Sequence, residues 1–398
     1  MTSAMMRTSL LLLAFAGLLI PACGSPASER ADQVPGPVAP APAPPASPVP
    51  PPAPQPPPPA PNPQELANQA VAYALNNGAR AVVIRNVGGI LVEGYGPTGG
   101  PDRGEFLASG TKSFSCPLFL FAEAEGLLAM DQIANSLLPQ WRVGGMAPDL
   151  DRKAGIRLDN LLSMTAGLAN DGASGLALND VDSYAQAIGD RSVEPADRVF
   201  GYGPNSFQAA LAMFQMATGG IARADGGVDG GRDPLDYLRD RLFVPLGIAP
   251  TGWLRDARGQ PNFGGGAEMT ARDWADFGQF LLDDGRAGGR QILPAGALGR
   301  CSSYRNEAFL PYGLGFWLNR NAGTSVDAAD RAPVPADIRS RWEAGGRYAS
   351  SVPESMFFAW GAGNAKMFIL PSHGLVAVKI GGGGDDDRFL GILIGSRT

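Results

Sequence analysis

The chain has 398 residues, a net charge of −6 and no run of basic residues, so we expect no nucleic-acid partner. Its three cysteines form no Cys-x-x-Cys motif, and its single histidine, His373, allows no histidine pair, so we expect no metal and no cofactor. A Ser-His-Asp site would need His373 beside a serine and an acid, and nothing around it supports that arrangement. We therefore expect His373 to lie in an exposed turn.

Residues 1–22 have the pattern of a secretory signal peptide, with an apolar run from Leu10 to Ile20 that is too short to predict a membrane span. Small Ala22 directly precedes Cys23, which resembles a bacterial lipobox. Cleavage there would leave Cys23 as a lipidated N-terminus and anchor the protein to a membrane of the cell envelope. In a Gram-negative source we expect this to be the outer membrane, with the protein in the periplasm. The alternative is an ordinary signal peptide cut at the same place and a secreted product.

Residues 23–62 form a proline-rich linker after the lipidation site. Such a segment favours the extended polyproline II conformation, so it is either a stalk that holds a domain away from a membrane or a disordered spacer. We assign residues 63–398 to one folded domain, with a mostly helical lobe at about residues 126–294.

The folded part begins with a predicted helix over Gln64–Asn77. Two β-rich runs, Arg80–Arg85 and Gly89–Glu93, then predict a hairpin. The segment Ser109–Glu125 reads as an apolar helix, which its composition predicts to be buried. We expect Pro117 to kink this helix about two turns after the serine.

Strand-like runs return near the C-terminus, with spacings typical of antiparallel strands joined by short turns, at Tyr312–Leu318, Met356–Trp360, Ala365–Leu370 and Leu375–Ile380. A last helix is predicted at Asp387–Gly395. The fold class is therefore α/β (α+β): an antiparallel β-sheet flanked by helices, with a large helical insertion. We expect Lys366 and Lys379 to face solvent, and Asp385–Asp387 to form a solvated turn that caps the last helix.

Ser109 and Lys112 form a Ser-x-x-Lys motif, which places the two side chains one helical turn apart on one face. The lysine amine can then serve as base for the serine hydroxyl, provided that burial lowers its pKa. Because the motif is short, it also fits an N-cap serine with a solvated lysine, and its surroundings have to decide between these interpretations.

Four further blocks in the right order give those surroundings. Ser109–Asp131, Leu161–Leu168, Gly264–Asp273 and Tyr312–Trp317 resemble successive motifs of the serine β-lactamase and penicillin-binding-protein superfamily. The resemblance is greatest to the class C branch, which also contains esterases and 6-aminohexanoate-dimer hydrolases. It implies a β-lactamase/transpeptidase-like fold and a serine hydrolase that needs no cofactor.

The family's Tyr-x-Asn element falls on Tyr202, which the resemblance assigns to proton transfer beside Ser109 and Lys112. A phenol there could be partly ionised and take the serine proton. The alternative is a core tyrosine with a satisfied hydroxyl. Pro204 stands where the family has asparagine, and Asn205 follows one residue late as the candidate for the asparagine's substrate contact.

The family's Lys-Thr-Gly element falls on Trp360-Gly361-Ala362-Gly363, so Trp360 replaces a cation that helps to hold the carboxylate of β-lactams. Glycines at Gly361 and Gly363 allow the strand end to approach the substrate. The resemblance implies an oxyanion hole made of the N–H of Ser109 and the N–H of Gly363, or of Ala362 if the register slips by one.

Cys116 and Cys301 remain as a pair if Cys23 carries lipid. In an oxidising compartment they either form a disulfide or stay as buried free thiols.

Together these features predict an exported, membrane-tethered serine hydrolase that acts on small esters or amides through an acyl-enzyme on Ser109. One alternative keeps the chemistry but makes the protein a D-alanyl peptidase or β-lactamase with a peptide or β-lactam substrate. Another makes it a catalytically inactive envelope-binding lipoprotein.

Overall fold

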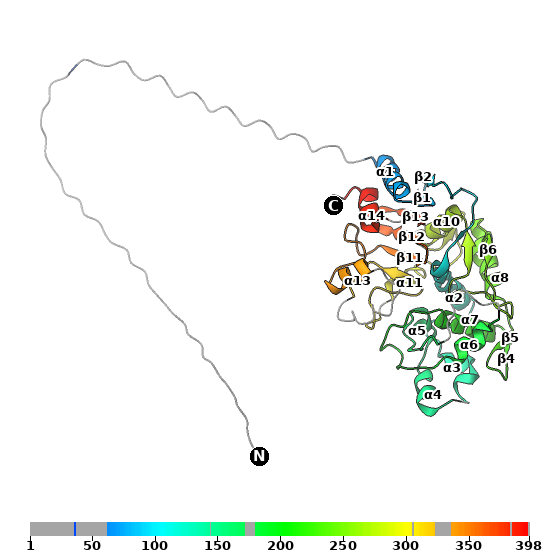
Figure 1. Cartoon of the computed structure of the whole chain (residues 1–398). Coiled ribbons are helices and arrows are strands. Elements are labelled where there is room, and N and C mark those ends of the chain that lie inside the picture. Colours follow the sequence, from blue (N-terminus) through cyan, green and yellow to red (C-terminus); the bar gives the residue numbers. More distant parts are fainter. Residues whose placement is uncertain are drawn as a thin grey trace, which may run out of the picture. The chain divides into compact units, whose positions relative to one another are not determined.

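The structure is a computed structural model, and it describes Gly36 and residues 62–143, 145–171, 180–304, 306–322, 336–382 and 384–396. The predicted signal peptide, the lipidation site Cys23 and the linker up to Pro61 lie outside these residues, Gly36 excepted. The folded unit spans Pro59–Thr398 (Figure 1). Within the described residues, none of the helices combines the length and the apolar character that crossing a membrane requires.

One part of the folded unit is a six-stranded antiparallel sheet. Its strands follow one another in the order β10 (Trp317–Leu318), β11 (Phe357–Gly361), β12 (Ala365–Leu370), β13 (Leu375–Ile380), β1 (Ala81–Asn86) and β2 (Gly89–Tyr95). The predicted hairpin β1–β2 pairs with β13, so the C-terminal strands complete a sheet that begins at the N-terminus. This confirms the predicted sheet and its closure, although only Trp317–Leu318 of the predicted strand Tyr312–Leu318 is a strand.

Helices cover both faces of this sheet (Figure 1). Helices α1 (Pro63–Asn76) and α14 (Asp386–Ile394) pack together on one face. Helix α10 (Ala271–Leu282) lies on the other face, against β1, β12 and β13. The helical lobe was predicted to extend to about residue 294. It ends before α10, because this helix packs on the sheet.

The helical lobe is built around α7 (Asn205–Ala217), which is buried along most of its length. The lobe also contains short strands and helices, namely α3 (Ala134–Leu137), η2 (Pro139–Trp141), α4 (Ala147–Lys153), α5 (Leu158–Leu162), α6 (Ser183–Gly189), β4 (Gly220–Ala222), β5 (Val228–Gly230), α8 (Pro234–Leu238), η3 (Arg239–Phe243) and α9 (Val244–Leu246). Helices α5 and α6 pack directly on α7, so one apolar helix organises the lobe.

The remaining elements join the sheet to the lobe or cover its ends. They are β3 (Glu105–Phe106), β6 (Gly252–Trp253), β7 (Ala267–Met269), β8 (Arg286–Ala287), β9 (Arg290–Gln291), α11 (Gly299–Ser303), α13 (Ala336–Glu343) and η4 (Pro371–His373). The strands β3, β7 and β6 form a small sheet beside the lobe. His373 is exposed at the end of η4, as predicted for a turn residue.

The segment with the Ser-x-x-Lys motif is not one continuous α-helix. A 3-10 helix, η1 (Ala108–Phe114), leads directly into α2 (Ser115–Ala124). Pro117 lies in the first turn of α2, where its missing N–H costs no intrahelical hydrogen bond. The predicted kink at Pro117 is therefore replaced by a change of helix type before it. The apolar α2 is buried, as its composition predicted.

Cys116 of α2 and Cys301 of α11 form a disulfide, with their Cα atoms 5.9 Å apart. Both cysteines are buried. The bond ties the helix that follows the candidate nucleophile to the segment that leads into β10. Of the two interpretations that the sequence left open, the structure contains the disulfide.

Lys366 and Lys379 are buried, which contradicts the expectation that they face solvent. They lie side by side on β12 and β13, and both ammonium groups pair with the buried carboxylate of Asp386 in α14. Tyr348 donates a third hydrogen bond to this carboxylate, at 2.7 Å. Asp385 does cap α14, by accepting from the N–H of Arg388, but Asp386 is part of the core and not of a solvated turn.

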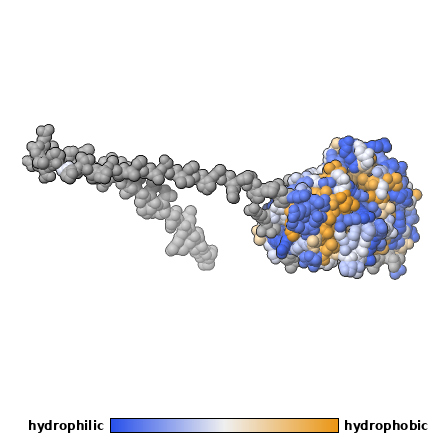
Figure 2. Space-filling view, turned by 90° about the horizontal axis from the view of Figure 1, so that it is seen from above, coloured by the Kyte–Doolittle hydropathy of each residue, from blue (hydrophilic) through white to orange (hydrophobic). Residues whose placement is uncertain are grey.

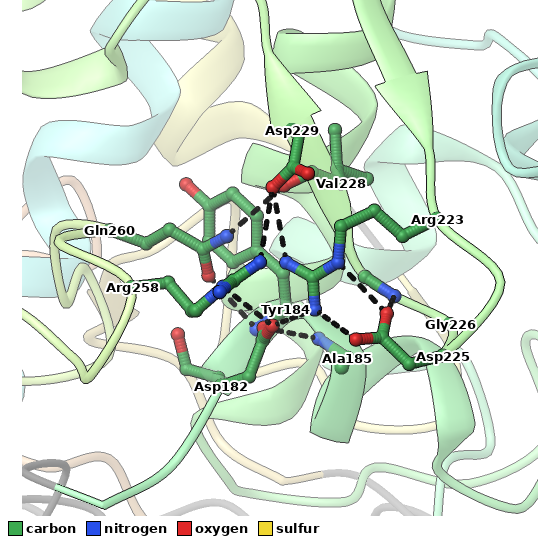
Figure 3. A network of polar contacts seen from close by, with 12 residues as sticks. Asp182, Tyr184, Ala185, Arg223, Asp225, Gly226, Val228, Asp229, Arg258 and Gln260 are labelled. Atoms are coloured by element: carbon green, nitrogen blue, oxygen red, sulfur yellow. Dashed lines mark hydrogen bonds and ion pairs between the residues drawn. The ribbon is translucent and has the colours of Figure 1, made fainter.

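A second charged network ties α6 to the β4–β5 hairpin (Figure 3). Arg223 binds Asp182 at 2.5 Å, Asp225 at 2.7 Å and Asp229 at 3.2 Å, and Arg258 lies within 3.7 Å of Asp182. These residues lie away from the pocket described below. Each carboxylate has an arginine partner, which is typical of a structural cross-link.

Seen from above, the surface of the folded unit mixes apolar and hydrophilic residues (Figure 2). The most exposed large apolar side chains of the described residues, Val87, Met146 and Ile221, belong to three different segments. Single exposed apolar residues of this kind are common on globular proteins.

Candidate active site

A pocket of about 480 Å³ lies where η1, the loop before α7, the loop before β7 and the end of β11 meet. Its lining comes from five separate parts of the sequence: Ala108, Ser109, Lys112, Tyr202, Gly203, Pro204, Gly264, Gly265, Trp317, Trp360, Gly361, Ala362, Gly363 and Asn364. All three predicted catalytic residues are among them. The pocket sits between the sheet and the helical lobe, where a cleft was expected.

Lys112 Nζ lies 3.1 Å from Ser109 Oγ. The lysine is 2% exposed, which excludes the alternative of a solvated lysine beside an N-cap serine. Its amine also donates to the carbonyl oxygen of Gly264 at 2.6 Å. Two contacts therefore fix the position of the amine, one to the candidate nucleophile and one to the loop before β7.

Burial lowers the pKa of Lys112 to about 7. The surroundings of the amine explain this direction, because it faces the rings of Tyr202 at 4.9 Å and Phe207 at 5.7 Å and no carboxylate compensates its charge among the pocket residues. A desolvated ammonium loses its proton more easily than a hydrated one. At neutral pH a large fraction of Lys112 is therefore a neutral amine, whose lone pair can accept a proton.

Tyr202 lies between this amine and the aromatic wall of the pocket, and its ring stacks on Trp317 with the centroids 5.7 Å apart. Burial raises the pKa of Tyr202 to about 12, and a hydrogen bond with Ser109 acts in the opposite direction. The phenol is therefore neutral at neutral pH, contrary to the expectation of a partly ionised phenol. Lys112 is the better base, and Tyr202 is suited to donating a hydrogen bond or relaying a proton.

The residue before the candidate nucleophile has an unusual backbone conformation. Ala108 has a φ of +45°, which is a strained value for a residue with a Cβ atom. Thr111 holds this turn, because its hydroxyl donates to the carbonyl of Ala108 at 2.6 Å and accepts from the N–H of Ala267 at 3.0 Å. The conformation of Ala108, the first residue of η1, thus sets the position of Ser109, and the contact of Thr111 with β7 helps to hold it.

The end of β11 forms the wall opposite η1. Gly361 is the last residue of β11, and Ala362, Gly363 and Asn364 form the turn into β12. Gly363 has a φ of +75° and Asn364 a φ of +58°, so a tight turn places successive backbone amides beside the pocket. Both candidates for the second oxyanion donor, Gly363 and Ala362, line the pocket with Ser109.

Asn205 does not reach the pocket, so its predicted substrate contact is wrong. It begins α7, and its amide donates to the carboxylate of Asp190 at 2.9 Å inside the lobe. Pro204 lines the pocket instead of Asn205. It packs closely against Gly264, since a Cβ atom added to Gly264 would lie 2.6 Å from the Cβ of Pro204. The one-residue shift relative to the family pattern therefore turns the asparagine inward.

Two groups of this site were not assigned from the sequence. The carbonyl of Gly264 contacts the lysine amine, and Trp317 forms part of the wall next to Trp360, with the ring centroids 5.7 Å apart. The glycine run Gly264–Gly266 was the available signal for the first, since such runs allow a backbone to approach a site closely. Nothing in the sequence around Trp317 shows whether this residue lines a pocket or packs in the core.

Nothing in the site suggests a bound metal. Within the described ranges, no group of three or more histidine, cysteine, aspartate or glutamate side chains is arranged to hold an ion. The pocket can hold a carbonyl compound between Ser109 and the β11–β12 turn.

The Beta-lactamase family model matches residues 77–381. No curated protein matches the chain by sequence. Among solved structures, a penicillin-binding protein homolog from Caulobacter crescentus is 17% identical with a TM-score of 0.56, and the match covers 84% of this chain and 96% of that one. A class C β-lactamase from Rhodobacter sphaeroides is 16% identical with a TM-score of 0.54, over 83% of this chain and 99% of that one.

A family VIII carboxylesterase is 15% identical with a TM-score of 0.55, over 84% of this chain and 96% of that one. At such identities these structures confirm the predicted fold and say nothing about the substrate. The family model covers the sheet, the pocket and the helical lobe alike, and with it the chain belongs to the Beta-lactamase family of serine hydrolases.

Proposed function

We propose that this chain is an exported, membrane-tethered hydrolase that cleaves small neutral esters or amides through an acyl-enzyme on Ser109. The observation that carries this proposal is the buried amine of Lys112, 3.1 Å from Ser109 Oγ with a pKa lowered to about 7. A base of this pKa operates efficiently near neutral pH.

Ser109 Oγ attacks the carbonyl carbon of the substrate while Lys112 Nζ takes the hydroxyl proton. The N–H groups of Ser109 and Gly363 stabilise the resulting oxyanion. Lys112 returns the proton to the leaving oxygen or nitrogen through the phenol of Tyr202, and the bond between this atom and the carbonyl carbon breaks. A water molecule then attacks the acyl carbon and gives one proton to Lys112. The bond between this carbon and Ser109 Oγ breaks, and Lys112 returns the proton to Ser109 Oγ, which releases the acid and restores the free enzyme.

The lining of the pocket favours substrates with a neutral acyl group. Among its lining residues, all of them in the described part of the chain, Lys112 is the one charged side chain. The apolar surface of the wall comes from Trp360, Trp317 and Pro204. A carboxylate on the substrate would lose its hydration without gaining a cationic partner at this wall, which disfavours carboxylate-bearing β-lactams and D-alanyl peptides.

Export and anchoring are proposed from the sequence of residues 1–62. The apolar run, the lipobox-like Ala22-Cys23 and the proline-rich linker support a lipidated Cys23 followed by a stalk. Metabolic labelling with a fatty acid tests this directly. The wild type should carry label and partition with membranes, and Cys23→Ala should carry none.

The proposed chemistry is tested by the intact mass of the purified chain after exposure to a fluorophosphonate. We expect one adduct on the wild type and none on Ser109→Ala or Lys112→Met. An adduct on Ser109→Ala would place the nucleophile elsewhere. No adduct on any of the three would favour the non-enzymatic binding protein.

The proposed substrate class is tested with two 4-nitrophenyl esters of equal acyl length, one ending in a methyl group and the other in a carboxylate. We expect kcat/KM to be about tenfold or more higher for the neutral ester, an effect that one unpaired charge readily produces. Equal values, a stable penicillin adduct on Ser109 or hydrolysis of nitrocefin would favour the cell-wall peptidase or β-lactamase instead.

A further inference from the structure

The side chain of Asn170 contacts the backbone on both sides of Tyr202. Its amide donates to the carbonyl of Gly201 at 3.3 Å and to that of Leu168 at 3.4 Å. On the other side of Tyr202, a Cβ atom on Gly203 would stand 2.0 Å from Asn170 Oδ1. Asn170 therefore contacts the residue before and the residue after the tyrosine, and a larger residue at Gly203 would have no room.

Asn170 is itself held in a left-handed conformation, with a φ of +58°. Its own N–H donates to Asp190 Oδ2 at 2.8 Å, and the N–H of Asp171 donates to Asp190 Oδ1 at 3.2 Å. Asparagine tolerates this backbone region better than most residues, and the two bonds to one carboxylate fix it further.

The same carboxylate reaches the segment that follows Tyr202. Asn205, the first residue of α7, donates its amide to Asp190 Oδ2 at 2.9 Å. Asp190 is buried and follows the last residue of α6. Burial raises the pKa of its carboxyl, and the three donors act against this shift by stabilising the charged form. Tyr202 is thus bracketed by Asn170 upstream and Asn205 downstream, and Asp190 binds both.

We propose that Asp190 and Asn170 are positioning residues for Tyr202, holding its phenol at hydrogen-bond distance from Ser109. The inference rests on the proposed function, in which Tyr202 relays the proton to the leaving group. Neither residue lines the pocket, so both act through the 201–205 segment. A small displacement of a proton donor is enough to slow an acyl transfer strongly.

A double-mutant cycle between Asp190→Asn and Tyr202→Phe in the full chain tests the proposal. The readout is kcat/KM for an alkyl ester, whose leaving alkoxide needs a proton. We expect Asp190→Asn to lower kcat/KM about tenfold or more when Tyr202 is present, and by less than about twofold in the Tyr202→Phe background. An equal loss in both backgrounds would overturn the inference, since the effect would then not pass through Tyr202.

Fluorophosphonate labelling of Ser109 separates this outcome from a failure of the proposed function. Fluoride leaves without a proton, so Asp190→Asn should still be labelled if only Tyr202 has moved. An unlabelled wild type would overturn the proposed function. If Asp190→Asn does not fold, Asn170→Gly replaces it in the cycle, because glycine keeps the positive φ and removes only the side chain.

Asp182→Asn is the matched control. Asp182 caps the other end of α6 by accepting from the N–H of Ala185 at 2.9 Å, and it binds Arg223 far from Tyr202. Asparagine is also a good N-cap, so we expect kcat/KM to change less than about twofold. A loss as large as that of Asp190→Asn would show a general effect of α6 and would overturn the inference.

Discussion

Gly361 at the end of β11 lies so close to Leu107 that a Cβ atom on Gly361 would stand 1.9 Å from the Leu107 carbonyl oxygen. The same Cβ would be 2.9 Å from the N–H nitrogen of Gly110 in η1. No side chain larger than hydrogen fits there. This contact places the end of β11 directly against the start of η1, and Gly361 and Ser109 from these two segments both line the pocket.

Gly361→Ala should therefore push the β11–β12 turn away from η1 and widen the gap between the two oxyanion donors. We expect kcat/KM to fall about a hundredfold or more, as it does when one oxyanion donor is removed, with a lower melting temperature from overpacking. Gly299→Ala, at an exposed position with open space around it, is the control and should change neither quantity. Full activity in Gly361→Ala would show that the wall adjusts without cost.

The pKa of Lys112 predicts how activity depends on pH. The base is active as a neutral amine, so kcat/KM should be low in acid, rise through a pKa of about 7 and stay high above it. Tyr202 should not add a second decline near neutral pH, since its pKa is about 12. A rate–pH profile for a neutral ester measures this. A profile that is flat between pH 5 and 9, roughly the range in which such a base titrates, would exclude Lys112 as the base.

The same pKa predicts how stability depends on pH. Between pH 7 and 10.5, the buried Lys112 is neutral in the folded state and protonated in the unfolded state. Because the unfolded state then binds one more proton, the free energy of unfolding should rise by about 1.4 kcal/mol per pH unit. Lys112→Met should lack this increment, while all other groups titrate as in the wild type. Urea unfolding of both proteins across this range gives the difference, and parallel curves would contradict a lowered pKa.

The disulfide between Cys116 and Cys301 closes a loop with a sequence separation of 185 residues. A cross-link over so long a loop restricts the unfolded chain strongly, and its loss should cost roughly 2–5 kcal/mol. We expect the double variant Cys116→Ala/Cys301→Ala to melt at a lower temperature and to be insensitive to a reductant. Cys23→Ser keeps both cysteines of the folded unit and should respond to the reductant as the wild type does. A melting temperature that the double substitution leaves unchanged would show that the bond adds no stability.

Local patterns in the sequence predicted much of the fold and the centre of the site. The spacing of Ser109 and Lys112 is a property of one helical turn, and the strand-like runs of the last three strands are properties of single strands. The resemblance assigned Tyr202 and the end of β11 to the candidate site through short motifs of the family, and both line the pocket.

Groups that depend on distant contacts could not be predicted in this way. The isolated strand sequences of Lys366 and Lys379 fit a solvated face, and only the packing of α14 over them supplies the carboxylate that makes burial tolerable. Asn205 likewise looks like a displaced site residue until the burial of Asp190 shows where its amide points. In both cases the deciding partner lies on another secondary-structure element, so its position depends on how the elements pack and not on the local pattern.

Asp386 provides the last prediction, because it joins the two lysines of the sheet to the C-terminal helix. The two ammonium groups hold the pKa of this carboxyl below its usual range although burial acts to raise it. Asp386→Asn removes the charge that both lysines share, and we expect it to lower the free energy of unfolding by roughly 3–5 kcal/mol. Replacing all three residues by apolar ones (Asp386→Leu, Lys366→Met and Lys379→Met) should cost much less, since no buried charge of the cluster is then left without its counter-ion. Urea unfolding compares the two variants, and a single variant as stable as the wild type would show that water reaches this cluster.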